Sequence, residues 1–211
     1  MPSILTFGDS NTHGMAPMTA KGDYRRFAPD VRWPGALRRL KGADLIEDGL
    51  PGRTAQFPDP VNGAHMDGRP ALRMALESHG PLDLLVLMLG TNDIKTRFGA
   101  TPEMVTAGIA GLIDLALTPV LQARHGGFRV LLICPPPVLE QGPIAGEFIG
   151  SHGKSLALPP LYQALAAAHG VGFLDAGRVI GPSPLDGVHY DEAAHAALGQ
   201  AVATAVTALL A

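Results

Sequence analysis

Two short runs of almost wholly aliphatic residues constrain the fold more than any other feature of the sequence. Residues 82–89 read LDLLVLML and residues 129–134 read RVLLIC. Apolar runs of this length are typical of strands that are buried on both faces of a parallel sheet. Three further strand candidates cover residues 4–8, 43–48 and 171–174. Helical or short helical segments at 33–40, 66–78, 101–123 and 155–169 separate the five strand candidates, and a last one at 191–210 follows them. This alternation predicts an α/β fold, a three-layer α/β/α sandwich with a five-stranded parallel sheet.

Length and charge narrow the class of protein. The chain has 211 residues, of which 46% are hydrophobic, so we expect one domain over residues 1–211. Its net charge is −3 with 17% charged residues, which gives no reason to expect a nucleic-acid partner or an anionic membrane surface. The single cysteine, Cys134, excludes an internal disulfide. No signal segment or apolar run of membrane-spanning length is evident, so we expect a cytoplasmic protein that acts on a small molecule.

Polar or glycine-bearing segments follow the predicted strands, and they are the candidate site. They are Gly8-Asp9-Ser10, Gly49-Leu50-Pro51-Gly52, Gly90-Thr91-Asn92-Asp93 and Asp186-Gly187-Val188-His189. The carboxyl ends of parallel strands meet at one edge of the sheet, so these segments can converge. Ser10 is the candidate nucleophile, with a helix N-cap or a turn residue as the alternative. A serine hydroxyl needs a base and oxyanion donors before it can react, and the other segments hold residues of both kinds.

The four segments, in this order, resemble the signature blocks of the SGNH (GDSL) hydrolase family, which has a flavodoxin-like fold. Segments 26–33, 47–54 and 88–93 are similar to the arylesterase and acyltransferase branch of that family. The resemblance implies that Ser10 is the nucleophile, His189 the base and Asp186 the residue that orients the imidazole. It also implies an oxyanion hole formed by the backbone N–H groups of Ser10 and Gly52 and the side-chain amide of Asn92.

The resemblance implies a serine esterase that hydrolyses small carboxylic esters, with short-chain ones such as acetyl esters as the expected substrates and transfer of the acyl group to alcohols or peroxide as a second outcome. A carbohydrate acetyl esterase and a non-catalytic binding protein on the same fold remain as alternatives. A flavodoxin-like nucleotide binder is disfavoured because no Gly-rich phosphate loop follows the first strand. The chain also lacks the Gly-x-Ser-x-Gly motif of the α/β-hydrolases.

The remaining polar residues carry weaker expectations. No pair of histidines has the spacing of metal ligands, so we expect no metal and no cofactor. Asp9 and Asp93 are expected to brace their turns, and Cys134 to be an inert core thiol. His13 is a candidate substrate contact. The candidate pocket lining is apolar: Met15, Phe27, Leu50, Ile94 and Phe148. The Gly-rich segment 138–154 is expected to form a lid or an oligomer contact, which makes a homo-oligomer plausible.

Overall fold

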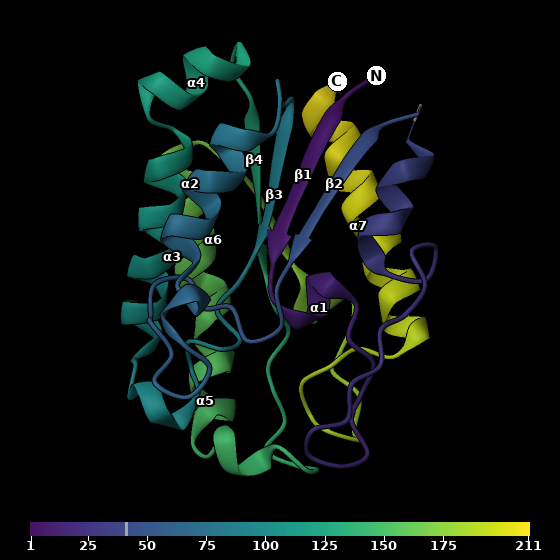
Figure 1. Ribbon diagram of the computed structural model, residues 1–211, viewed down its shortest axis with the longest axis vertical. Coiled ribbons are helices and arrows are strands. Elements are labelled where there is room, and N and C mark those ends of the chain that lie inside the picture. The colour runs from purple at the N-terminus through teal and green to yellow at the C-terminus, as the bar shows by residue number, and fades with distance from the viewer. Residues whose placement is uncertain (41) are drawn as a thin grey trace.

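A parallel sheet forms the centre of the computed structural model, which describes residues 1–40 and 42–211. Its strands run in the order β2-β1-β3-β4-β5, and every neighbouring pair is parallel (Figure 1). Their bounds are β1 Ser3–Gly8, β2 Asp44–Gly49, β3 Leu84–Met88, β4 Arg129–Cys134 and β5 Gly172–Asp175. All residues of β3 are buried, as expected of a strand covered on both faces. The five predicted strands are therefore confirmed to within two residues at each end.

Helices cover both faces of the sheet and complete the three layers (Figure 1). One face packs against α2 (Gly68–Ser78), α3 (Pro102–Ala116) and α6 (Leu158–His169), around a core that includes Leu72, Ile109 and Tyr162. The other face packs against the 3-10 helix η1 (Trp33–Arg39) and α7 (Glu192–Leu210), around a core that includes Trp33 and Val202. The predicted three-layer α/β/α sandwich is confirmed.

Two predicted helices are each divided in the structure. The segment 101–123 forms α3 and a separate helix α4 (Pro119–His125), and the two axes are bent by 54°. Pro119 causes the break because it lacks an N–H group and disfavours helical backbone at the preceding Thr118, which is extended with ψ 140°. The segment 155–169 is likewise split: its first residues end α5 (Ser151–Leu156), and α6 begins at Leu158.

The apolar helix α7 differs from expectation in one respect. Its 19 residues are long and apolar enough to span a membrane by length and composition alone, although the sequence predicted no run of that kind. The helix is a layer of the fold, because His195, Leu198, Val202 and Val206 are buried in the core that it shares with η1. Its many alanines account for the high hydropathy.

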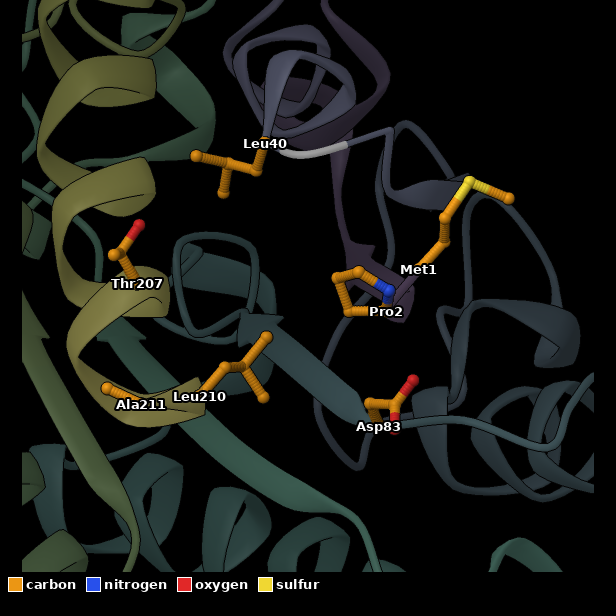
Figure 2. A pocket seen from close by; sticks show the side chains of 7 residues that line it. All are labelled: Met1, Pro2, Leu40, Asp83, Thr207, Leu210 and Ala211. Carbon is orange, nitrogen blue, oxygen red and sulfur yellow. The ribbon is translucent and has the colours of Figure 1, made fainter.

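The two ends of the sheet differ: the candidate site lies at the carboxyl end of the strands, and a separate cavity lies at the opposite end. The carboxyl end of β1 leads directly into the short helix α1 (Ser10–His13), which lies at the lower edge of the sheet in Figure 1. At the opposite end a cavity of about 430 Å³ lies between β1 and the last turns of α7 (Figure 2). It is lined by Met1, Pro2, Leu40, Asp83, Thr207, Leu210 and Ala211. Asp83 accepts a hydrogen bond from Ser3 N at 2.8 Å, which is a structural role.

Candidate active site

Ser10 is the first residue of α1 and is positioned by the turn that follows β1. Asp9 caps the helix, since its carboxylate accepts a hydrogen bond from Asn11 N at 2.9 Å. A glycine is required at position 8, because a Cβ there would lie 2.1 Å from Thr12 Oγ1 and 2.7 Å from Met88 O. The tight turn leaves Ser10 only 6% exposed, and it lines a cavity at the carboxyl edge of the sheet.

His189 and Asp186 reach Ser10 from a loop that precedes α7. The imidazole Nε2 lies 3.1 Å from Ser10 Oγ, and Nδ1 lies 2.6 Å from Asp186 Oδ2. These distances place a base within hydrogen-bond reach of the hydroxyl and a carboxylate behind the base. The structure therefore brings together the three residues that the sequence predicted as nucleophile, base and orienting carboxylate.

Asp186 is held as a carboxylate by donors from two segments. Its Oδ1 accepts hydrogen bonds from Val188 N at 3.0 Å and His189 N at 2.9 Å, and its Oδ2 accepts one from Met18 N at 2.8 Å. Burial raises the pKa of Asp186, but the hydrogen bond and charge of His189 and the backbone donors outweigh it and hold the pKa below its ordinary value. The ionised form fixes the imidazole with Nδ1 as the donor, which leaves Nε2 free to accept the serine proton.

The three residues that carry the predicted oxyanion donors, Ser10, Gly52 and Asn92, line the same cavity. Gly52 adopts φ +90°, a left-handed conformation that favours glycine. Asn92 Nδ2 donates to Arg53 O at 3.1 Å and makes a second contact of 3.4 Å with Asp9 Oδ2. The second contact is long for an N–H···O bond, so that N–H group is only weakly held. A developing oxyanion would offer it a stronger acceptor.

Arg53 connects the segments that carry these donors. Its Nη1 donates to Gly8 O at 3.0 Å and to Asp48 O at 2.7 Å, and its Nη2 donates to Asp48 Oδ1 at 2.8 Å. The guanidinium carbon lies 4.1 Å from the centre of the Phe7 ring. Because Arg53 follows Gly52 and its carbonyl holds Asn92, one buried residue contacts all three segments. Arg53 lies in the segment 47–54 that resembles the arylesterase branch, but its residue type alone predicted no role for it.

Asp9 and Asp93 brace their turns, as the sequence predicted. Asp93 accepts hydrogen bonds from Ala55 N at 2.9 and 3.0 Å, which ties the segment of Asn92 to that of Gly52. Burial raises the pKa of Asp9 to about 6, against the hydrogen bond from Asn11 and the charges of His189, Lys95 and Arg53. Burial, with the charge of Asp9 adding to it, raises the pKa of Asp93 to about 7.

The cavity beside Ser10 has a volume of about 330 Å³ and is less apolar than expected. Among the five predicted lining residues, Met15 and Phe148 line it, whereas Phe27, Leu50 and Ile94 do not. Ile94 is buried in the core below the site, and Phe27 packs edge-on against His195 with ring centres 5.4 Å apart. The segment 138–154 contributes Ile144, Glu147 and Phe148, so it forms a wall of the cavity.

The sequence did not predict the charged side chains that line the cavity. They are Lys21, Lys95, Arg97 and Glu147. Lys95 follows the Asn92-Asp93 block by two residues. This closeness to a signature block is the one sequence feature that could have placed Lys95 at the site. Glu147 lies in a Gly-rich segment without periodicity, and its partners Lys95 and Arg97 are about 50 residues away, so nothing in the sequence pairs them.

His13 and Cys134 lie outside the cavity that Ser10 lines. His13 contacts Gly49 O at 3.1 Å and Tyr24 OH at 2.8 Å and does not line the cavity. Burial raises the pKa of the Cys134 thiol well above its usual value, consistent with an inert core residue. Within residues 1–40 and 42–211, no group of three or more His, Cys, Asp or Glu side chains is arranged to hold a metal ion.

Comparisons with known proteins show the family to which the chain belongs. Residues 6–197 match the model of the GDSL-like lipase/acylhydrolase family. The comparison with curated proteins gave no match. Among solved structures, the chain is similar to Est24, a carbohydrate acetylesterase from Sinorhizobium meliloti, with 38% identity, a TM-score of 0.92, and 99% of this chain and 100% of that chain covered.

A second similar structure is the native aryl esterase of M. smegmatis, with 38% identity, a TM-score of 0.93, and coverage of 99% of this chain and 100% of that chain. A third is a carbohydrate acetylesterase family member from Sinorhizobium meliloti, with 34% identity, a TM-score of 0.88, and coverage of 100% and 99%. The family match covers residues 6–197, a range that includes the Ser10 turn, Gly52, Asn92, Asp186 and His189. The chain therefore belongs to the GDSL-like lipase/acylhydrolase family.

Proposed function

We propose that the protein hydrolyses small carboxylic esters through an acyl-Ser10 intermediate. The observation that carries this proposal is a chain of two hydrogen-bond contacts beside a cavity. Ser10 Oγ lies 3.1 Å from His189 Nε2, and His189 Nδ1 lies 2.6 Å from Asp186 Oδ2. Family membership and the esterases among the similar structures support the same reaction class.

In the first step His189 Nε2 accepts the proton of Ser10 as Oγ attacks the ester carbonyl. The negative charge that develops on the carbonyl oxygen is stabilised by the N–H groups of Ser10 and Gly52 and by the amide of Asn92. The imidazolium then gives its proton to the departing alcohol oxygen, and the acyl group stays on Ser10. Asp186 keeps the imidazole in the required tautomer and stabilises its charged form.

In the second step water enters, loses a proton to His189 Nε2 and attacks the acyl carbon. Collapse of the second tetrahedral intermediate breaks the bond to Ser10 Oγ, which takes back its proton from His189. An alcohol or peroxide that occupies the position of water would accept the acyl group instead, which makes acyl transfer a second outcome of the same site.

The size of the cavity favours a short acyl group. A volume of about 330 Å³ is at the lower end of the range typical of ligand pockets, and it must hold both portions of the ester. Acetyl esters therefore fit best. A carbohydrate acetyl ester is a second candidate, because Lys95, Glu147 and Asn62 offer hydrogen-bonding groups within the cavity to the hydroxyls of a sugar.

The test is hydrolysis of p-nitrophenyl acetate by the wild-type protein and by Ser10→Ala. The proposal predicts activity that Ser10→Ala loses, with an unchanged circular dichroism spectrum. Equal rates for the two proteins would contradict it. Acetyl, butyryl and octanoyl esters of aryl, alkyl and sugar alcohols, assayed with and without an added alcohol, then define the acyl length and the share of transfer.

A further inference from the structure

One wall of the cavity carries more charge than hydrolysis of a neutral ester requires. Glu147 is contacted by Lys95 Nζ at 3.1 Å, by Arg97 Nη1 at 2.9 Å and by Lys21 Nζ at 3.8 Å. All four side chains line the cavity that holds Ser10 and His189. Three cations therefore converge on a single carboxylate at the candidate active site.

The Arg97 guanidinium contacts two carboxylates, Glu147 and Asp59, whereas the Lys95 ammonium contacts one. The Arg97 guanidinium also binds Asp59 Oδ2 at 2.6 Å, and Asp59 in turn accepts hydrogen bonds from Val61 N and from the backbone and side chain of Asn62. Among the described residues, Glu147 is the one carboxylate that lies within 4.0 Å of Lys95 Nζ. An ammonium group has three donors, so Lys95 retains donors for a substrate.

The surroundings of Lys95 favour an additional anion. Its side chain is only 10% exposed, and burial lowers its pKa, with Glu147 opposing the shift and Arg97 adding to it. A lowered lysine pKa reflects the cost of an ammonium that is removed from water without enough negative charge around it. Including Asp59, the wall has three cations and two carboxylates, although the whole chain has a net charge of −3.

The location of this charge points to the alcohol portion of the ester. A short acyl group occupies little of the cavity, and Lys21 at the rim is 73% exposed, so this end opens to solvent. Resting on the proposed ester hydrolysis, we propose that Lys95, with Lys21 at the rim, forms a subsite for a negatively charged group, such as a carboxylate, on the alcohol portion of the substrate. Glu147 holds both lysines in place and limits the strength of this attraction.

Three acetyl esters that carry an anionic, a neutral or a cationic substituent at the same ring position test the subsite, and the anionic and neutral substituents have nearly the same shape. They are 4-acetoxybenzoate (anionic), 4-acetoxybenzamide (neutral) and 4-acetoxyphenyl-trimethylammonium (cationic). Each kcat/KM is divided by the rate of alkaline hydrolysis of the same ester, which removes differences in intrinsic reactivity. We expect the anionic ester to be preferred over the neutral one by about tenfold, the size expected of one charge-assisted hydrogen bond, and the cationic ester to be the poorest.

Variants of Lys95 and Glu147 show whether these two residues cause the preference for the anionic ester. Lys95→Met should bring the ratio of anionic to neutral ester close to one, and Glu147→Gln should raise it above the wild-type ratio. Lys154→Met is the matched control, because Lys154 lies on α5 outside the cavity lining, and its ratio should equal that of the wild type. Competitive inhibition by 4-hydroxybenzoate against 4-hydroxybenzamide gives the same comparison without turnover.

The outcomes separate the two proposals. A wild-type ratio near one, with the neutral ester hydrolysed, overturns the anionic subsite and leaves ester hydrolysis standing. The same holds for a preference that Lys95→Met and Glu147→Gln both leave unchanged. Absence of hydrolysis for all three esters overturns the proposed function and the subsite together. Because the wild-type ratio and the inhibition constants need no variant, a poorly folded Lys95→Met protein does not leave the subsite undecided.

Discussion

Replacement of Arg53 by Met tests how the three oxyanion donors are held together. Methionine keeps an apolar contact with the Phe7 ring, over which the guanidinium now lies at 4.1 Å. It removes the hydrogen bonds to Gly8 O at 3.0 Å, to Asp48 O at 2.7 Å and to Asp48 Oδ1 at 2.8 Å. The first of these bonds holds the turn that carries Ser10 against the turn that carries Gly52.

The expected loss of stability follows from these contacts. A hydrogen bond to a charged group contributes about 1.5–3 kcal/mol when it is buried. Gly8 O retains Leu50 N as a donor at 3.1 Å, and the Asp48 side chain is 29% exposed, so water replaces part of what is lost. The free energy of unfolding should therefore fall by about 3 kcal/mol rather than by the sum of three full bonds. The oxyanion donors should also lose their alignment, so kcat should fall by about 10- to 100-fold, with a smaller change in KM.

Urea denaturation and p-nitrophenyl acetate kinetics measure the two effects. Arg73→Met is the control, because Arg73 forms an exposed pair with Glu77 on α2, and its loss should change the free energy of unfolding by less than about 1 kcal/mol. A double-mutant cycle with Asn92→Ala separates alignment from general damage. If Arg53 acts through the oxyanion hole, Arg53→Met should reduce kcat less in the Asn92→Ala background. Equal reductions in both backgrounds, or an unaltered kcat in Arg53→Met, would refute this reasoning.

Three further variants test other parts of the site. Asn92→Ala should lower kcat by about 10²–10³-fold through the loss of one oxyanion donor, with a melting temperature close to that of the wild type. Asp186→Asn should lower kcat by about 10³–10⁴-fold because the amide favours the wrong imidazole tautomer, and steady-state kinetics show whether KM stays within a few-fold of the wild-type value. Asp93→Asn should flatten the pH dependence of stability. The pKa of Asp93 is raised in the folded state from 3.8 to about 7, so the folded state binds more protons, and wild-type stability should fall as pH rises through this window. Urea titrations across this pH range should show a loss on the order of 2–4 kcal/mol that the variant lacks, and parallel curves would contradict the assignment.

The sequence predicted the sheet and the convergence of its strand-end segments for a simple physical reason. Strands that are buried on both faces must be aliphatic on both faces, which makes residues 84–88 and 129–134 recognisable without any partner. Once the strands are parallel, Ser10, Gly52 and Asn92 must lie at one edge of the sheet. The helix boundary at Pro119 was not predicted, because the apolar spacing of the sequence continues across the proline that ends the helix.

The walls of the cavity could not be predicted in the same way. They come from loops, where apolar spacing is absent and a residue's neighbours are set by tertiary packing. Ile94 follows a signature block yet points into the core, whereas Lys95, the next residue, lines the cavity. The pairing of Lys95 and Arg97 with Glu147 links segments about 50 residues apart, and only the folded structure brings them together.

Covalent labelling of the nucleophile tests the central claim most directly. The protein is treated with a serine-directed p-nitrophenyl phosphonate, and the adduct is located by peptide mass spectrometry while hydrolysis of p-nitrophenyl acetate is followed in parallel. The account predicts one adduct per chain, on Ser10, with activity lost in proportion to labelling and no adduct in Ser10→Ala. An adduct on another residue that accompanies the loss of activity, or full activity in the labelled protein, would contradict it.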